Sequence, residues 1–332
     1  MSSIRVGVYG ASGYAGLDLV EILAQHPHTE VVFGTSSTYL GDMIPHTGLY
    51  YVRPEDAPLD EVDMVFLALP HKTSAQYAKR ARDAGKRVID LSADLRLHSA
   101  EAYSRWYGEH PHPELLPVPY GLPEMHRDEL RGASIIAVPG CYPTTTLLGL
   151  YPLLETRALE LDAPIIVDAK SGVSGAGRNP SDKTHFVEVY GNLSPYNTGR
   201  RHRHVGEIEQ EINKFGPYGE PLVFSPHLLP VDRGLMASIY VTLNPTLRTD
   251  HVHSLYTNIY ADEPLVQVKP LGQEATLRDA VRTNMCVISV NPVNEHLVHI
   301  TSVTDNLRKG AASQAVQCYN LMYDWPETLA LL

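Results

Sequence analysis

Cysteine is scarce in this sequence: its 332 residues include only Cys141, Cys286 and Cys318. Three widely spaced cysteines do not suit a disulfide framework or a zinc site built on cysteine pairs. We therefore expect no bound metal, and a reducing compartment such as the cytoplasm. In that setting each cysteine is either a buried packing residue or a nucleophile.

Long apolar runs are missing as well. The apolar stretches have the length of strands, as in residues 64–69, and none approaches the roughly 20 residues that a membrane span needs. A strand pattern begins by Ile4, which leaves no room for a signal peptide. We therefore expect no membrane partner.

Basic residues are in deficit. Lys and Arg number 27 against 38 Asp and Glu, and the net charge is −11. Such a chain repels backbone phosphates, so a nucleic-acid partner is not expected. The overall charge still allows a local basic pocket for a small anionic substrate.

The first half of the chain alternates between strand and helix patterns. Apolar strands are predicted at residues 4–8, 30–34, 64–69, 87–91 and 134–138, and helices at 17–24 and 73–84. This alternation is typical of parallel βαβ units with right-handed crossovers. Residues 97–125 are rich in proline and aromatic residues, and we interpret them as a long irregular excursion.

The second half has fewer helices between its strands. Strands are predicted near residues 164–170, 222–228, 236–243, 286–290 and 299–303, which favours a mixed or antiparallel α+β domain. Small residues then recur on one face of a predicted helix over residues 306–322. Because small residues allow close approach, we expect this helix to pack back on the first domain.

A glycine turn follows the first strand directly, with the spacing Gly10-x-x-Gly13-x-x-Gly16. Glycines let the backbone approach a pyrophosphate, and the helix that follows supplies free N–H groups and the positive end of its dipole. We therefore expect a dinucleotide at the turn; a simple tight strand–helix turn is the alternative. The predicted binding residues are Gly10, Ser12, Gly13, Tyr14, Ala15 and Gly16.

The end of the second strand indicates which dinucleotide binds. An NAD site usually has Asp or Glu there for the ribose 2′-hydroxyl, whereas this strand runs through Gly34, Thr35, Ser36, Ser37 and Thr38. Serine hydroxyls can donate to a 2′-phosphate, and no carboxylate opposes its charge. We therefore expect NADP, bound in part by Ser36 and Ser37.

Cys141 lies between a strand and a predicted helix. Pro143 occupies a position typical of the first turn, and leucines at helical spacing follow it. A helix N-terminus stabilises a thiolate and can bind an oxyanion. Cys141 is therefore the predicted nucleophile, whereas Cys286 and Cys318 fall inside strand and helix patterns and are expected to be structural.

A nucleophilic cysteine needs a proton partner. The run from Arg200 to His204 contains two histidines and precedes a helix predicted to start near Gly206. A helix N-terminus favours the neutral imidazole that can act as a base. His204 is our choice over His202, and a solvated basic turn is the alternative reading.

Several motifs occur together and in a specific order. They are Gly10-Ala-Ser-Gly-Tyr-Ala-Gly16, Asp90-Leu-Ser-Ala-Asp-Leu-Arg96, Tyr120-Gly-Leu-Pro-Glu124, Pro139-Gly-Cys-Tyr-Pro-Thr144, Ser171-Gly-Val-Ser-Gly-Ala-Gly-Arg178, His202-Arg-His204, Pro226-His-Leu-Leu-Pro230, Arg233-Gly234 and Asp305-Asn-Leu-Arg-Lys-Gly-Ala-Ala312. In these motifs the chain resembles the N-acetyl-γ-glutamyl-phosphate reductases of the aspartate-semialdehyde dehydrogenase superfamily, over nearly its whole length. Gly206, where the family usually has proline, and Ser313, where it usually has glycine, depart from the pattern.

The resemblance implies an α/β fold with two domains. A Rossmann-type parallel-sheet domain is expected from residues 1–140 plus 305–332. An α+β substrate and dimerisation domain with a mixed sheet is expected from residues 141–304. The resemblance also implies NADP, a homo-oligomer (dimer or tetramer), Cys141 as nucleophile and His204 as acid/base.

The implied reaction is reduction of an acyl phosphate to an aldehyde through a thioester on Cys141. A small substrate with a phosphate and a carboxylate requires cationic side chains, and Arg96 and Arg178 are the candidates because arginine forms bidentate pairs with both anions. His202 is expected to contact the substrate and Asn306 the cofactor. Surface ion pairs are the alternative for the two arginines.

Two other functions fit the same sequence. A related branch reduces an aminoadipyl or glutamyl phosphate carried on an acidic protein, and Arg200, Arg201 and Arg203 would supply a basic rim for such a carrier. A non-catalytic NADPH-sensing protein is the alternative from a different class. A sensor would not need a thiol at a helix N-terminus together with a histidine pair.

Overall fold

The computed structural model describes residues 3–332, and the chain divides into two compact units. The first unit is Met1–Gly140 with Ala311–Leu332, and the second is Cys141–Gly310. The sequence placed the return to the first unit at residue 305, whereas the division falls after Gly310. The backbone N–H of Gly234 donates to Asn306 Oδ1 at 2.8 Å, and that of Arg282 donates to Asp305 Oδ2 at 2.8 Å, so these two residues are held in the second unit.

The first unit contains a five-stranded sheet in the order β2-β1-β3-β4-β5, and all four pairings are parallel. Its strands are β1 (Ile4–Tyr9), β2 (Thr29–Gly34), β3 (Met64–Leu67), β4 (Arg87–Asp90) and β5 (Ile135–Ala137). Helix α1 (Tyr14–Gln25) contains the predicted segment 17–24, and helix α2 (Ser74–Asp83) lies within the predicted segment 73–84. The expected parallel α/β sheet is confirmed.

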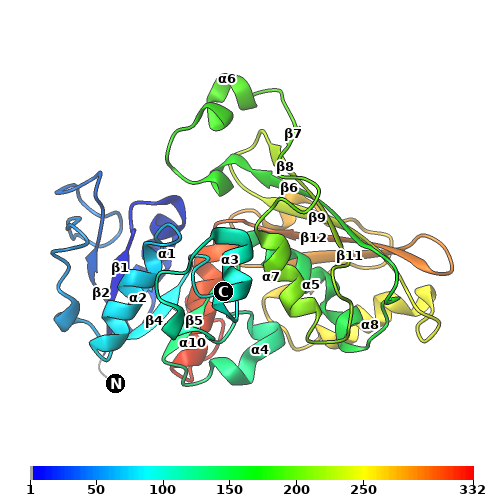
Figure 1. Ribbon diagram of the computed structural model, residues 1–332, viewed down its shortest axis with the longest axis horizontal. Helices are drawn as coiled ribbons and strands as arrows, with labels where there is room; N and C mark the ends of the chain where they lie inside the picture. The colour runs from blue at the N-terminus through cyan, green and yellow to red at the C-terminus, as the bar shows by residue number, and fades with distance from the viewer. Residues whose placement is uncertain (1–2) are drawn as a thin grey trace. The chain divides into compact units, whose positions relative to one another are not determined.

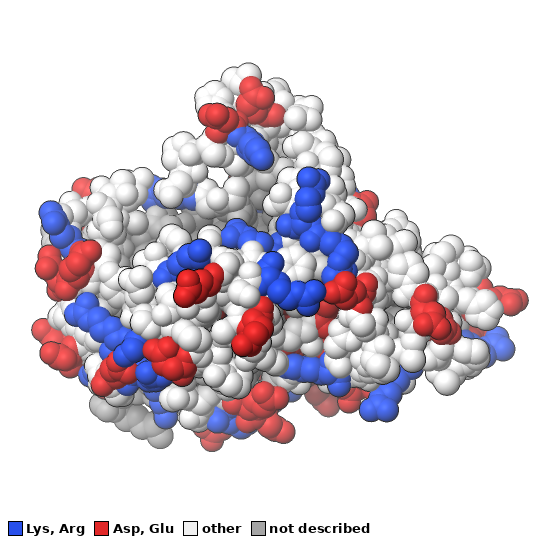
Figure 2. Space-filling model, viewed as in Figure 1, with Lys and Arg blue, Asp and Glu red and all other residues white. Residues whose placement is uncertain are grey.

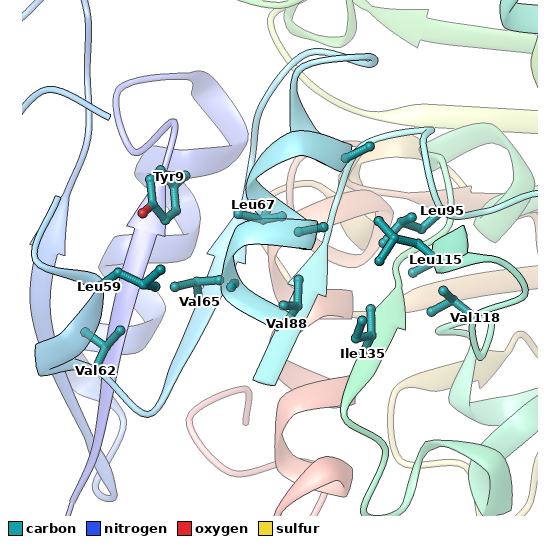
Figure 3. Close-up of a cluster of buried hydrophobic side chains, with 14 of the residues drawn as sticks. Tyr9, Leu59, Val62, Val65, Leu67, Val88, Leu95, Leu115, Val118 and Ile135 are labelled. Carbon is teal, nitrogen blue, oxygen red and sulfur yellow. The ribbon is translucent and has the colours of Figure 1, made fainter. Parts of the chain in front are cut away.

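A cluster of buried aliphatic side chains lies between this sheet and α2 (Figure 3). Figure 3 labels Val65, Leu67 and Val88 on the strands, and Ala75, Ala78 and Ala81 of α2 belong to the same buried cluster. Alanine at three positions of one helical face lets α2 lie close against the strands. Full burial of each aliphatic strand residue contributes about 1.5–3 kcal/mol, so this layer accounts for much of the unit's stability.

Residues 97–125 are more regular than the sequence predicted. Helix α3 (Ala100–Tyr107) begins after Ser99, whose hydroxyl accepts a hydrogen bond from the N–H of Ala102 at 3.1 Å. Helix α4 (Pro123–Leu130) begins with a proline at its first position, where the missing N–H costs nothing. The prediction of an irregular excursion was wrong for residues 100–107 and from residue 123 onward, because a serine cap begins α3 and a proline at the first position suits the start of α4.

The C-terminal helix α10 (Ser313–Met322) packs with α1 and α4 in the first unit, and Figure 1 draws it in red beside β4 and β5. The carbonyl oxygen of Gly121 accepts from Gln314 Nε2 at 2.8 Å and from Cys318 Sγ at 3.2 Å. The expected packing of this helix on the first domain is therefore confirmed. Cys318 is fully buried and has a structural contact.

The second unit contains a seven-stranded mixed sheet in the order β10-β11-β12-β9-β6-β8-β7. Pairs β10–β11 and β6–β8 are parallel, and the other four are antiparallel. Its strands are β6 (Ile165–Gly172), β7 (Ser194–Pro195), β8 (Leu222–Leu229), β9 (Leu235–Thr242), β10 (Val266–Val268), β11 (Cys286–Pro292) and β12 (Leu297–Thr304). The expected mixed sheet is confirmed.

One face of this sheet is covered by helices. Helix α5 (Cys141–Glu155) packs on β9 and β12, and α7 (His204–Ile212) and α8 (Val252–Ile259) pack beside α5. Figure 1 shows these three helices below the strands. The opposite face is open in a single chain: Ile166, Val223 and Tyr240 are 38, 47 and 36% exposed, although each alternates with fully buried neighbours along its strand.

The remaining segments are short. They include the helices α6 (Phe186–Val189) and α9 (Leu277–Ala280) and the 3₁₀ turns η1 (Leu59–Glu61), η2 (Pro113–Leu115), η3 (Val173–Ala176), η4 (Asp182–Thr184) and η5 (Thr249–His251). No helix within residues 3–332 is both long and apolar enough to cross a membrane. On the face drawn in Figure 2, acidic and basic side chains are interspersed.

Candidate functional site

The glycine turn of the first unit joins β1 to α1. Gly10 has a φ of +76°, and a Cβ there would lie 2.3 Å from the carbonyl oxygen of Ala68. A Cβ on Gly16 would lie 2.3 Å from the carbonyl oxygen of Gly10. These two glycines are therefore required by the turn itself, because no other residue fits between its backbone segments.

Gly13 is different. A Cβ at this position would meet only the carbonyl oxygen of Gly10, at an ordinary 3.5 Å, and its φ of −69° suits any residue. Gly13 is the N-cap of α1 and provides no side-chain oxygen for the first-turn amides. A glycine that the protein's own packing does not need, at a helix N-terminus, fits the close approach of a phosphate group.

The glycine turn is bonded to the end of β2. Ser12 Oγ donates to Ser36 Oγ at 2.8 Å, and the Gly10 N–H donates to Thr35 Oγ1 at 3.0 Å. Ser36 is buried and also accepts from the N–H groups of Thr38 and Tyr39, whereas Ser37 is exposed. The two segments predicted to bind the dinucleotide are thus adjacent, and they fit NADP because no acid ends the strand.

Two aspartates organise the loops at the carboxyl ends of β3 and β4. Asp90 is fully buried and accepts from the hydroxyls of Ser74 and Ser92, and burial raises the pKa of its carboxyl to about 6. Asp94 accepts from the N–H groups of Lys72 and Ala75 and from the hydroxyl of Tyr103. Both aspartates lie in the motif Asp90–Arg96, but the sequence alone did not predict this structural role for their carboxylates.

In the second unit, Cys141 is the first residue of α5, two positions earlier than proline placement predicted. Its side chain is partly accessible, whereas Cys286 is fully buried. Thr145 Oγ1 donates to the Cys141 carbonyl oxygen at 2.9 Å and lies 2.7 Å from Thr304 Oγ1. The thiol therefore sits at a helix N-terminus that is tied to β12.

The two histidines of the His-Arg-His motif lie together at the start of α7. Their ring centroids are 4.8 Å apart, and the His204 N–H donates to His202 Nδ1 at 3.2 Å. Helix α7 begins at His204 itself, close to the predicted start. His202 thus satisfies one of the free amides of this helix and fixes where His204 begins it.

His202 is enclosed by aromatic rings. Those of Tyr142, Tyr196 and Phe224 lie 5.5, 5.6 and 5.2 Å from it, centroid to centroid. Burial, with a smaller contribution from the positive charge of Arg203, lowers the pKa of His202 to about 4. His202 is therefore neutral at physiological pH.

Two tyrosines that the sequence analysis did not select belong to this cluster. Tyr142 follows Cys141 in the chain and packs against both histidines, at 5.5 Å from the His202 ring and 6.1 Å from the His204 ring. Tyr196 donates its hydroxyl to the Tyr142 oxygen at 3.0 Å. Burial raises both tyrosine pKa values, that of Tyr196 to about 12, and the charge of Cys141 adds to each shift.

The predicted anion-binding arginines are in different environments. Arg96, in the first unit, is buried and donates from Nε to the Val138 carbonyl and from Nη2 to the Leu91 carbonyl, both at 2.7 Å. Arg178, in the second unit, is exposed in the loop between η3 and η4. Arg96 thus has an architectural contact at the ends of β4 and β5, and a phosphate-binding role for it stays a prediction.

Asn306, predicted to contact the cofactor, uses its side chain within the second unit. Its Oδ1 accepts from the Gly234 N–H at 2.8 Å and its Nδ2 donates to Ser174 Oγ at 3.0 Å. Its cofactor role stays a prediction. Among residues 3–332 no group of three or more His, Cys, Asp or Glu side chains is arranged to hold a metal ion.

Two family profiles match the chain. Residues 5–133 match the semialdehyde dehydrogenase NAD binding domain, and residues 141–306 match the semialdehyde dehydrogenase dimerisation domain. Among solved structures, aspartate semialdehyde dehydrogenase II from Vibrio cholerae has a TM-score of 0.77 at 20% identity and covers 98% of this chain and 99% of that one. The Candida albicans aspartate semialdehyde dehydrogenase with NADP has a TM-score of 0.73 at 15% identity, covering 97% and 99%. These likenesses establish the fold.

Curated relatives are more similar in sequence. The N-acetyl-gamma-glutamyl-phosphate reductase of Symbiobacterium thermophilum is 43% identical, over 99% of this chain and 98% of its own length. Those of Azotobacter vinelandii and Bacillus subtilis are 43% and 42% identical over the same shares. The aligned regions therefore span both units of the chain.

Proposed function

The chain belongs to the N-acetyl-gamma-glutamyl-phosphate reductase family, and from that premise we propose that it reduces N-acetyl-γ-glutamyl phosphate to N-acetylglutamate semialdehyde with NADPH. This is a step of arginine biosynthesis, and it makes the chain an NADP-dependent phosphorylating aldehyde dehydrogenase. One observation carries the proposal at the level of residues. Cys141 begins α5, and the next residue, Tyr142, packs on both histidines that begin α7.

Cys141 is the proposed nucleophile. Its thiolate attacks the acyl carbon, the bond from that carbon to the phosphate oxygen breaks, and phosphate leaves. The product is a thioester, and covalent capture divides a difficult reduction into two easier steps. The backbone N–H groups at the N-terminus of α5, which point away from the helix's own carbonyls, are suited to stabilise the oxyanion that forms during this attack.

The glycine turn and the end of β2 would hold the proposed cofactor, and Ser12, Gly13 and Ser37 are the residues proposed to bind its phosphates. When bound, NADPH would supply a hydride, which is two electrons and one proton, to the thioester carbon. The resulting thiohemiacetal on Cys141 loses its carbon–sulfur bond, which releases the aldehyde and regenerates the thiolate. One proton is consumed overall, because phosphate departs as hydrogen phosphate.

His204 is the proposed acid/base. It accepts the thiol proton before the attack, which leaves the thiolate. It then donates a proton to the oxyanion that hydride addition leaves, and it removes this proton again as the carbon–sulfur bond breaks. The choice of His204 over His202 is supported by two properties of His202. Its pKa of about 4 makes it a weak base that holds a transferred proton poorly near pH 7, and its Nδ1 already accepts from the His204 N–H.

We also propose a homo-oligomer, a dimer or a tetramer, formed through the open face of the mixed sheet. The match of residues 141–306 to a dimerisation domain supports this assembly, as do the exposed side chains of Ile166, Val223 and Tyr240. Sedimentation of the purified chain and of a Val223→Glu variant would test it. The three free cysteines support a reducing compartment such as the cytoplasm.

The decisive experiment is Cys141→Ser. In the reverse direction, with arsenate in place of phosphate, the variant should lose NADPH formation from the semialdehyde while binding NADPH as the parent does. Cys318→Ser is the matched control, because Cys318 is fully buried in the other unit and donates to the Gly121 carbonyl. Turnover of Cys141→Ser equal to that of the parent would eliminate the covalent scheme.

The substrate itself needs a separate test. N-acetylglutamyl phosphate should be reduced efficiently, and an acyl phosphate carried on an acidic protein should not. Arg200, one of the three arginines proposed as a basic rim, pairs with Glu209 at 2.7 Å and with Glu220 at 3.3 Å, which reduces its attraction for an acidic carrier. A preference for the carrier-bound substrate would replace the proposal with the carrier-linked reaction.

A further inference from the structure

Gly310 lies directly against Cys141. A Cβ built on Gly310 would be 2.8 Å from Cys141 Cβ and 3.3 Å from Cys141 Cα. Its backbone is not in the left-handed region, so the requirement for glycine here comes from space and not from the φ angle. The atoms it would meet belong to the backbone and the base of a side chain in a helix, and they cannot rotate away. Even one methyl group at residue 310 must therefore displace Cys141 or the turn that carries Gly310.

That turn is held firmly. Residues Arg308–Ala312 form a π-helical turn, and the Gly310 N–H donates to the carbonyl oxygen of Asp305 at 2.9 Å. The Asp305 carboxylate is fully buried and accepts from the N–H groups of Leu307 at 2.8 Å and Arg282 at 2.8 Å. Isolated π turns are rare and are frequently found at functional sites.

A second connection ties the same turn to the first turn of α5. Thr304 immediately precedes Asp305, and its hydroxyl lies 2.7 Å from that of Thr145. Thr145 in turn donates to the Cys141 carbonyl oxygen at 2.9 Å. The segment from Thr304 to Gly310 therefore contacts the start of α5 at both of its ends.

We propose that Gly310 is a positioning residue for the nucleophile: the turn from Asp305 to Gly310 forms a rigid support that sets where the Cys141 thiol stands at the N-terminus of α5. This inference rests on the proposed role of Cys141. It explains why residue 310 is a glycine although its φ angle does not require one. The support acts through backbone contact with Cys141. Its loss should therefore change the reactivity of the thiol more than the affinity for substrate.

The test compares Gly310→Ala with Gly149→Ala. Gly149 is on the same helix, and its added Cβ would meet Ile239 Cδ1 at 2.6 Å and Ser302 Cβ at 3.2 Å, both away from Cys141 and the turn from Asp305 to Gly310. In Gly310→Ala, kcat should fall at least about tenfold, since small displacements of a reacting group cost factors of this size, while KM changes less than about threefold. The pH midpoint of Cys141 alkylation by iodoacetamide, followed at that residue by mass spectrometry, should rise in Gly310→Ala only.

A double-mutant cycle tests the contact itself. Cys141→Gly removes the Cβ that Gly310→Ala would meet, so Gly310→Ala should destabilise the Cys141→Gly background less than the parent. Equal destabilisation in both backgrounds, or an unchanged kcat and alkylation midpoint in Gly310→Ala, would overturn the proposal. If Gly310→Ala does not fold, Asp305→Asn decides, because it keeps the number of heavy atoms and replaces one acceptor oxygen of the turn by a donor. A raised alkylation midpoint in Asp305→Asn supports the proposal, and an unchanged one overturns it.

Alkylation needs neither substrate nor cofactor, which separates this inference from the proposed function. If Cys141→Ser is inactive and Gly310→Ala keeps the parent's kcat and alkylation midpoint, only the positioning role of Gly310 is refuted. If Cys141→Ser turns over as the parent does, the proposed covalent mechanism is refuted, whatever the result for Gly310→Ala.

Discussion

The hydroxyl of Tyr196 donates a hydrogen bond to the phenolic oxygen of Tyr142 at 3.0 Å, 54 residues away along the chain. Tyr142 in turn donates to the His227 carbonyl at 3.5 Å, and its ring packs against both histidines of the site. Tyr142 is 2% exposed. The pair thus links the residue after Cys141 to β7 and β8.

The tyrosine pair predicts an asymmetry between two single substitutions. Tyr142→Phe leaves the partly buried Tyr196 hydroxyl without its acceptor and should lower the free energy of unfolding by about 1–3 kcal/mol. Tyr196→Phe leaves Tyr142 its donation to His227 and should cost less, about 0.5–1.5 kcal/mol. Urea unfolding of both variants measures the two costs. A larger cost for Tyr196→Phe would contradict the direction of this hydrogen bond.

His202 should make the fold sensitive to mild acid. Burial lowers its pKa to about 4, whereas an unfolded histidine titrates near 6.5, so protonation favours the unfolded chain. Its contribution is present in full above pH 6.5 and is lost as the pH falls toward 4, by about 3 kcal/mol. His202→Asn should remove this part of the pH dependence, and exchange of the exposed His296 should not. Parallel curves of unfolding free energy against pH for the parent and His202→Asn would refute the assignment.

Asp90 should change the free energy of unfolding with pH in the opposite direction to His202. Burial raises its pKa to about 6, whereas an unfolded aspartate titrates near 3.9, so the folded state favours the protonated carboxyl. The stabilisation is present in full below pH 3.9 and is lost as the pH rises through 6, by about 3 kcal/mol. Relative to the parent, Asp90→Asn should therefore gain stability between pH 4 and pH 7. Chemical denaturation at those two pH values measures the change, and a constant difference would rule out titration of Asp90.

Cofactor preference should depend on the end of β2. Ser37 is exposed there, and a carboxylate at this position would repel a 2′-phosphate. Ser37→Asp should raise the KM for NADPH at least about tenfold, since each 1.4 kcal/mol of lost binding is a factor of ten. The KM for NADH should not rise. Ser37→Asn has nearly the same shape without the charge and should keep the parent's preference; equal KM values for Ser37→Asp and the parent would move the 2′-phosphate site elsewhere.

The two arginines should respond differently to the same exchange. Arg96→Lys cannot reproduce two donations to the Val138 and Leu91 carbonyls, so it should lower the free energy of unfolding by about 1–3 kcal/mol. Arg178→Lys changes an exposed loop and should leave stability within about 0.5 kcal/mol. If Arg178 binds the substrate, its exchange raises the KM for the acyl phosphate. Unchanged KM and stability in Arg178→Lys would leave Arg178 without a role.

Local sequence was sufficient for several features. Apolar periodicity and the glycine spacing predicted the strand, turn and helix from β1 to α1, and the alternation of patterns predicted the parallel sheet. A cysteine between a strand and a run of leucines predicted a thiol at a helix start. Each of these depends on residues within about one turn or strand of one another, which is why a single sequence reveals them.

Other features required the tertiary structure. Tyr196 meets Tyr142 only because β7 pairs with β8, and Gly310 meets Cys141 only because β12 delivers the π turn to the start of α5. The division after Gly310, not at residue 305, follows from hydrogen bonds of Asp305 and Asn306 to Arg282 and Gly234. The sequence by itself determined the alternation of strands and helices that builds the parallel sheet, and the identity of the nucleophilic candidate. The residues that surround that thiol were decided by contacts between distant segments, which leave no periodic signal in the chain.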